Sequence, residues 1–130
     1  MEIKSKKITV NKSSEALFNF LKDVKNFELL MPDNISKFEV IRDDAFVFAL
    51  KGMPEIALEI KETQPNNKLV LGAISDKIPF TLEGSINDLG GDKSEIDLLF
   101  SGDFNPMMAM MIKSPITKFL DTLTSKMEAL

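Results

Sequence analysis

The sequence predicts an α+β domain in which a curved antiparallel sheet of about seven strands wraps around one long C-terminal helix. Apolar and polar residues alternate with a period of two over residues 35–104, which is typical of strands with one buried and one solvated face. From residue 105 the apolar residues recur every three or four positions, as in an amphipathic helix. A sheet with one apolar face and a helix with one apolar face can bury both surfaces by packing together.

The N-terminal part of the chain predicts one strand followed by two short helices. Residues 3–10 place Ile3, Ile8 and Val10 among lysines, a pattern that suits an edge or solvated strand. Small polar residues then supply caps for a helix with the sequence SSEALFNFLKD. Its buried side is expected to hold Leu17, Phe20, Leu21 and Val24. A second short helix, VKNFELL, ends at the Pro-Asp-Asn turn that follows.

Six further strands are expected between residues 35 and 104, separated by short turn signals such as Gly90-Gly91-Asp92. Gly84 and Gly102 fall at alternating positions that face the apolar side of the sheet. They could form bulges that bend the sheet or leave space for a ligand, and bulges are favoured. The residues expected on the apolar face are Phe38, Val40, Phe46, Phe48, Leu50, Ile56, Leu58, Ile60, Leu69, Leu71, Ala73, Phe80, Leu82, Ile86, Ile96, Leu98, Phe100 and Phe104.

The C-terminal helix carries two start signals, Asn105-Pro106 and Ser114-Pro115. A proline inside a helix removes a backbone hydrogen bond and crowds the preceding turn, at a cost of about 3 kcal/mol. A methionine-rich lead-in over residues 106–113, a kink or short break, and a main helix over residues 115–128 are therefore expected. The sheet-facing residues of this helix should be Ile112, Ile116, Phe119, Leu123 and Met127, and the water-facing ones Lys113, Lys118, Asp121 and Lys126.

Composition restricts the function. A chain of 130 residues is expected to form one domain, residues 1–130, with a net charge of −4 and a single arginine, Arg42. These values argue against nucleic-acid binding, and the lack of a long apolar run argues against stable membrane insertion or a signal peptide, so a cytoplasmic location is expected. The absence of His, Cys, Tyr and Trp leaves only Asp, Glu, Lys, Ser and Thr for catalysis, and no metal-ligand spacing or cofactor motif is present.

The expected element order, together with the stretch ITVNKSSEALFNFLKDVKNFELLMPDNISKFEV, resembles the START-like (SRPBCC) superfamily over the whole chain. In that stretch a strand, a small-residue cap and a helix ending near Asp23 are followed by Met31-Pro32 before the next strand. Members of this superfamily have the helix-grip fold and include polyketide cyclases and dehydrases, lipid-transport domains and birch-pollen allergen relatives. The pattern is similar to the subgroup that contains the G subunit of carbon monoxide dehydrogenase. The resemblance implies a cavity between the sheet and the last helix that holds a hydrophobic small molecule. The buried hydroxyl residues that the cyclase branch would need are missing, so its catalytic role does not carry over.

On this resemblance, the expected function is the binding of a hydrophobic or amphipathic molecule, lipid-like or quinone-like, without chemistry and without a cofactor. The expected pocket lining comprises Phe46, Phe48, Leu58, Leu71, Phe80, Leu82, Leu98, Phe100, Phe104, Met108, Met111, Ile112 and Phe119. The cluster formed by Met107, Met108, Met110 and Met111 has three interpretations: filler of a small core, an adaptable gate over a pocket mouth, or an exposed surface for a partner or a membrane.

Two other functions remain open on the sequence alone. The first is a cyclase- or dehydrase-type enzyme, which a buried carboxylate or lysine in the pocket would favour. The second is a co-chaperone-like interaction module that binds a protein partner or a second copy of the chain. A closed, solid core with exposed Met107 and Met111 would favour the interaction module.

Overall fold

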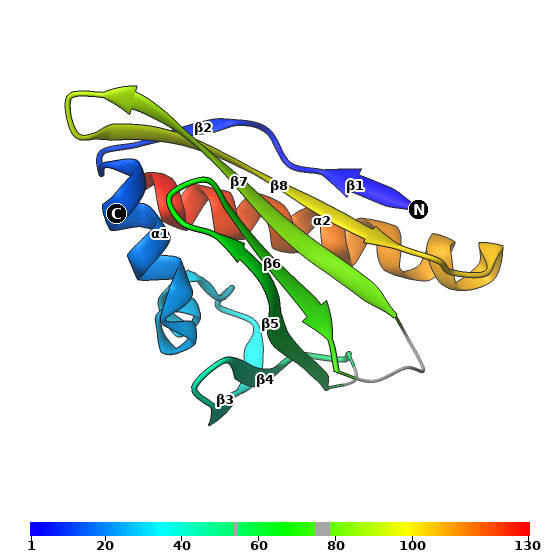
Figure 1. Ribbon diagram of the computed structural model, residues 1–130. Helices are drawn as coiled ribbons and strands as arrows, with labels where there is room; N and C mark the ends of the chain where they lie inside the picture. The colour runs from blue at the N-terminus through cyan, green and yellow to red at the C-terminus, as the bar shows by residue number, and fades with distance from the viewer. Residues whose placement is uncertain (54, 75–78) are drawn as a thin grey trace.

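The computed structural model describes residues 1–53, 55–74 and 79–130 (Figure 1). Its elements, in chain order, are β1 (Glu2–Lys4), β2 (Ile8–Val10), α1 (Ser14–Lys22), the 3₁₀ helix η1 (Val24–Leu30), β3 (Ile35–Arg42), β4 (Ala45–Leu50), β5 (Ile56–Gln64), β6 (Lys68–Ala73), β7 (Phe80–Gly90), β8 (Lys93–Gly102) and α2 (Pro106–Glu128). The predicted fold class is confirmed: the chain forms a curved antiparallel sheet, two short helices and one long C-terminal helix.

The sheet has the strand order β1-β8-β7-β6-β5-β4-β3, and β2 also pairs with β8. The single N-terminal strand expected from the sequence is wrong, because two short strands stand in its place. Between them, the Ser5 hydroxyl oxygen accepts a hydrogen bond from the backbone N–H of Leu98 at 2.8 Å, and the Ser5 N–H donates to the Leu98 carbonyl at 2.9 Å. A side-chain oxygen thus replaces a backbone acceptor, which interrupts the regular ladder without removing the first segment from β8.

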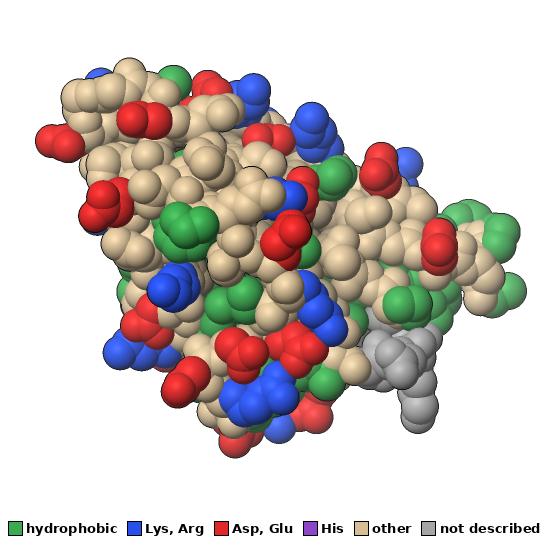
Figure 2. Space-filling model, in the orientation of Figure 1, with side chains coloured by type: hydrophobic (Ala, Val, Ile, Leu, Met, Phe, Trp, Pro, Cys, Tyr) green, Lys and Arg blue, Asp and Glu red, His purple; other side chains and the backbone are tan. Residues whose placement is uncertain are grey.

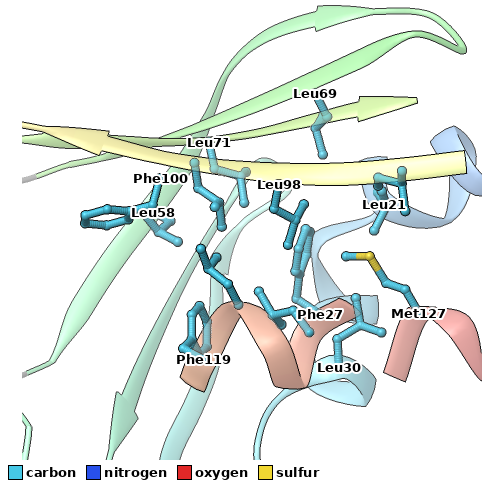
Figure 3. Packing of buried hydrophobic residues seen from close by; sticks show 14 of the residues in the cluster. Leu21, Phe27, Leu30, Leu58, Leu69, Leu71, Leu98, Phe100, Phe119 and Met127 are labelled. Atoms are coloured by element: carbon cyan, nitrogen blue, oxygen red, sulfur yellow. The ribbon is translucent and has the colours of Figure 1, made fainter. Parts of the chain in front are cut away.

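The concave face of the sheet packs on α2, and the core lies between them (Figure 1). Leu69, Leu71 and Leu98 point from the sheet toward the helix, and Phe119 and Met127 point back from it (Figure 3). Four of the five predicted sheet-facing helix residues are buried, and Ile112 is half-buried. The predicted orientation of α2 is therefore confirmed, with Leu120 as an additional buried residue.

One predicted water-facing residue of α2 has a structural contact instead. The Lys126 ammonium donates a hydrogen bond to the backbone carbonyl of Met31 at 2.5 Å and lies 3.7 Å from the Asp33 carboxylate. Lys126 is only partly exposed, whereas Lys113, Lys118 and Asp121 are exposed as expected. This contact ties the last turns of α2 to the segment that connects η1 with β3.

The short break predicted as one alternative in the C-terminal helix is wrong, because α2 is one continuous helix with Pro115 in its interior. The other alternative, a kink at Pro115, stays a prediction. Asn105 caps its start by accepting a hydrogen bond from the N–H of Met108 at 2.8 Å. Pro115 still lacks the N–H that would bond the Met111 carbonyl, so one helical hydrogen bond is missing. Burial of Ile116 and Phe119 directly after the proline holds the helix in register, and tertiary packing outweighs the local signal.

Three smaller expectations also need correction. In α1 the buried ring belongs to Phe18 rather than to Phe20, which is only half-buried. Val40 is exposed, because β3 is an edge strand with register shifts against β4 at both of its ends. Gly84 and Gly102 are not bulges, since both pair in regular register with neighbouring strands.

Candidate ligand site between the sheet and the C-terminal helix

A small cavity lies where the resemblance placed a pocket, between the sheet and α2. Its volume is about 20 Å³, and its lining is apolar: Leu21, Phe27, Leu69, Leu71, Leu82, Gly84, Leu98, Leu123 and Met127. A space of about 10–15 Å³ is enough for one water molecule. This inner cavity therefore cannot hold a lipid-like or quinone-like molecule in the observed packing.

Stacked phenylalanine rings fill much of the remaining interior. The ring of Phe119 on α2 stacks on Phe48 with centroids 5.1 Å apart. Phe48 contacts Phe46 at 6.0 Å, and Phe46 stacks on Phe27 of η1 at 5.2 Å. The row of rings runs from the outside of the helix interface to Phe27, which lines the inner cavity. Stacked aromatic pairs add about 0.5–1.5 kcal/mol each beyond simple burial, so opening this interior is costly.

A larger space opens on the outside of the same interface. This groove, called the α2 groove below, has a volume of about 430 Å³ and is lined by Pro32, Asn34, Leu50, Lys51, Met53, Ser114, Pro115, Lys118, Phe119 and Thr122. Its volume falls within the range of about 300–1,000 Å³ that is usual for ligand pockets. Leu50 and Phe119 are buried at its floor, and Lys51 and Lys118 are exposed at its rim.

Each wall of the α2 groove has a defined local structure. The helix residues lie one turn apart on a single face of α2, because positions 114, 118 and 122 and positions 115 and 119 are spaced by four. The opposite wall is a turn in which the Met53 N–H donates to the Leu50 carbonyl at 2.9 Å, with Gly52 at a φ of 84°. The third wall is the connection that contains Pro32 and Asn34. The Lys51 N–H donates to the Asn34 carbonyl at 2.9 Å, which joins the turn to this connection.

The thirteen residues expected to line a pocket separate into five groups in the structure. Leu71, Leu82 and Leu98 line the inner cavity, and Phe119 lines the α2 groove. Four are packed in the solid core: Phe46, Phe48, Leu58 and Phe100. Four are half-buried: Phe80, Phe104, Met108 and Ile112. Met111 is exposed.

Most residues of the α2 groove were not identified from the sequence. Lys51 and Met53 lie in a turn and Pro32 and Asn34 in a connection, where a period-two or period-three pattern carries no information about facing. The available signals were indirect: Gly52 marks a tight turn, and Pro115 marks the helix face that lines the groove.

The methionine-rich start of α2 lies apart from both spaces. Met107, Met110 and Met111 are 74, 82 and 71% exposed, and the helix residues lining the groove begin at Ser114. Figure 2 shows hydrophobic side chains gathered at the end of the molecule where α2 begins. These three residues are called the methionine surface below. As placed, they cover neither the groove nor the inner cavity.

The described groups with a shifted pKa belong to strands β3, β5 and β6 and do not line the groove. The Glu59 carboxylate accepts hydrogen bonds from Lys61, at 2.7 Å, and from Arg42, which together hold the pKa of Glu59 below its usual range. A hydrogen bond to Glu62 raises the pKa of Lys68. Five carboxylates of the sheet region are exposed or half-buried: Glu39, Glu59, Glu83, Asp97 and Asp103.

The described residues contain neither a metal-binding cluster of three or more acidic side chains nor a helix that is long and apolar enough to cross a membrane.

Comparison with solved structures identifies the fold. A START superfamily protein from Mycobacterium smegmatis matches with a TM-score of 0.76 at 16% identity, covering 98% of this chain and 94% of that one. Norcoclaurine synthase from Thalictrum flavum, solved with a transition-state analogue, matches with a TM-score of 0.79 at 13% identity, covering 99% and 92%. A conserved protein from Geobacillus kaustophilus matches with a TM-score of 0.69 at 14% identity, covering 99% and 93%.

No family model and no curated protein sequence matches the chain. At these low identities the structural likeness concerns the fold. The chain has the START-like, helix-grip fold over nearly its whole length, as the resemblance implied.

Proposed function

We propose that this protein binds an apolar or amphipathic small molecule in the α2 groove and performs no chemistry on it. The observation that carries the proposal is the open groove of about 430 Å³ with Leu50 and Phe119 at its floor. Both side chains belong to the core, so a ligand in the groove would extend an existing apolar surface. Each buried methylene of such a ligand contributes about 0.8 kcal/mol.

The groove, rather than the interior, is the proposed site because the interior is filled. The inner cavity of about 20 Å³ would need several core side chains to move before it could hold a chain of carbon atoms. A lipid-like or quinone-like ligand would lie along α2, between the helix face at Ser114 and Lys118 and the turn at Met53. Norcoclaurine synthase, which shares the fold, has been solved with dopamine and hydroxybenzaldehyde, so the fold can bind small organic molecules.

The composition of the groove supports binding without catalysis. The described residues that line it include no carboxylate, imidazole or thiol, and its two titratable side chains are exposed lysines. Acid–base catalysis generally needs a group whose pKa is shifted by burial or by a close charge. Neither lysine is buried, and no ion pair involves either of them among the described residues, which gives no support to the enzyme alternative.

Titration with decanol, a neutral apolar probe, tests the proposal. Amide chemical shifts should move for residues around Lys51, Met53 and Ser114 and saturate with one site. The variant Met53→Asp should weaken binding at least severalfold, because it puts a carboxylate on the apolar wall. The matched control Met110→Asp makes the same replacement at an exposed site outside the groove and should bind normally. Shifts confined to other regions, or equal effects of the two variants, would overturn the proposed site.

The methionine surface favours a second function, the docking of an apolar partner surface. Three exposed methionines on one end of a helix, above a core with almost no free volume, match the pattern expected of an interaction module. A second copy of the chain is the simplest partner to test, by sedimentation over a range of protein concentrations. Replacing Met107, Met110 and Met111 by Gln should abolish self-association, whereas replacing exposed Leu29 and Leu89 by Gln should not.

A further inference from the structure

Lys51 lies at the rim of the α2 groove in a hydrogen-bonded turn. It occupies the second position of the turn from Leu50 to Met53, in which Gly52 supplies the positive φ of 84° that a type II turn requires. The Lys51 N–H is fixed to the Asn34 carbonyl at 2.9 Å. The backbone of this lysine is thus held on both sides, while its ammonium group is exposed.

Lys118 approaches the same groove from α2. It lies one helical turn after Ser114 and one turn before Thr122, and all three side chains line the groove. The Thr122 hydroxyl donates to the Lys118 carbonyl at 3.0 Å, within a stretch of helix that is anchored by buried Phe119 and Leu120. Lys51 and Lys118 therefore stand on two separate, well-anchored walls of one apolar space.

The described residues that line the groove carry charge of one sign only. They include two lysines and no acidic residue. Three carboxylates lie close in sequence to the walls but are not among the lining residues. Asp33 lies 3.7 Å from the Lys126 ammonium, and Glu55 accepts a hydrogen bond from Lys37. Asp121 of α2 is exposed and does not line the groove. A chain with a net charge of −4 thus carries a locally cationic rim beside an apolar floor.

We infer that the ligand of the α2 groove is an anionic amphiphile, whose apolar chain lies against Leu50 and Phe119 and whose headgroup binds Lys51 and Lys118. This inference rests on the proposed function and specifies its ligand class, such as a fatty carboxylate or an alkyl sulfate. Asn34, Ser114 and Thr122 supply uncharged hydrogen-bonding groups on the same rim. Two ammonium groups from different walls recognise a headgroup with several acceptor oxygens better than they recognise a hydroxyl.

Calorimetric titration with decanoate, decanol and decyltrimethylammonium, each below its micellar concentration, tests the inference. The three probes share one chain and differ in headgroup charge. Decanoate should bind more tightly than the other two. Lys51→Gln and Lys118→Gln should each weaken decanoate binding roughly three- to tenfold, the range for a charge-assisted contact that is partly solvated, and leave decanol binding unchanged. The control Lys113→Gln removes an exposed lysine of the same helix outside the groove and should change nothing.

Charge reversal provides the sharpest result. The double variant Lys51→Glu/Lys118→Glu should prefer decyltrimethylammonium over decanoate, which no merely structural role of the lysines would produce. Equal binding of decanoate and decanol to the unmodified protein would overturn the headgroup assignment and leave the apolar groove intact. Failure of all three probes to bind would overturn the proposed function itself.

Discussion

Gly84 of β7 lines the inner cavity, and a methyl group added there should stabilise the protein. A Cβ atom at this position would lie 3.5 Å from Leu98 Cδ2 and 3.6 Å from Ile96 Cδ1, which are ordinary contact distances. Gly84 is not among the glycines with a positive φ, so alanine fits its backbone conformation. Loss of conformational freedom in the unfolded chain contributes about 0.4–1 kcal/mol, and one buried methyl adds about 0.8 kcal/mol. Gly84→Ala should therefore raise the free energy of unfolding by about 1–2 kcal/mol.

Gly102 of β8 is the matched control, because it also lies in a regularly paired strand. There a Cβ atom would meet the Phe104 ring at 2.7 Å and the Phe80 Cβ at 2.9 Å. The Phe104 ring can turn away, but the Cβ of Phe80 is fixed to the backbone of the adjacent strand. Gly102→Ala should lower the free energy of unfolding by about 1–3 kcal/mol, as overpacking usually does.

Urea unfolding of both variants, followed by circular dichroism, measures these two changes. The midpoint should rise for Gly84→Ala and fall for Gly102→Ala, with the slope unchanged. A loss of stability in Gly84→Ala, or the same sign for both variants, would refute the close packing described around these glycines. Decanol binding adds a second readout: Gly84→Ala should leave it unchanged, whereas weaker binding would place the ligand in the inner cavity instead of the α2 groove.

Three further predictions concern α2 and the outer face of the sheet. Phe119→Ala should cost about 3–5 kcal/mol in chemical denaturation, because the ring is buried and stacked on Phe48; a cost below about 1 kcal/mol would contradict the helix orientation. Since the pKa of Glu59 is lowered in the folded state, its ion pairs stabilise the protein at neutral pH, and this contribution is lost as the pH falls below about 4. Glu59→Gln should therefore flatten the acid limb of a stability–pH curve at low salt, and an unchanged limb would argue against these ion pairs. Hydrogen exchange should be faster over residues 107–113 than over residues 118–126, because the buried residues of α2 begin at Ile116; equal protection would indicate that packing extends to the methionines.

The architecture could be predicted from the sequence because one face of the sheet is buried. Alternation with a period of two assigns Phe46, Leu58 or Leu98 to that face whatever the exact strand ends are, and the helix stripe does the same for Phe119. The structure differs from the prediction where one local contact outweighs the pattern of apolar residues. The Ser5 side chain divides the first strand, and packing after Pro115 carries the helix through a local stop signal.

The site was less predictable because it forms between elements rather than along one. Phe119 is the only expected pocket residue that lines the α2 groove, and the other groove walls come from turns brought together by the sheet. Inward parity identifies the core, but it cannot distinguish a packed core from a cavity wall. Whether Phe46 and Phe48 fill the interior depends on how their rings stack across strands, which is a property of the assembled fold.

The open shape of the α2 groove decides how its ligand gains affinity. An enclosed pocket buries about 70–90% of a small ligand, whereas a chain lying in a groove keeps one side in water and gains less from apolar contact. The difference in binding between decanoate and decanol should then come from Lys51 and Lys118, and its origin should be ionic. Raising the salt concentration from low to physiological and above should reduce decanoate affinity and leave decanol affinity nearly constant. The preference should persist from pH 5 to 8 when an alkyl sulfate replaces the carboxylate, because the chain has no histidine to titrate in that window. A preference that survives high salt, or one that disappears within that pH range, would mean that a group other than the two rim lysines recognises the headgroup.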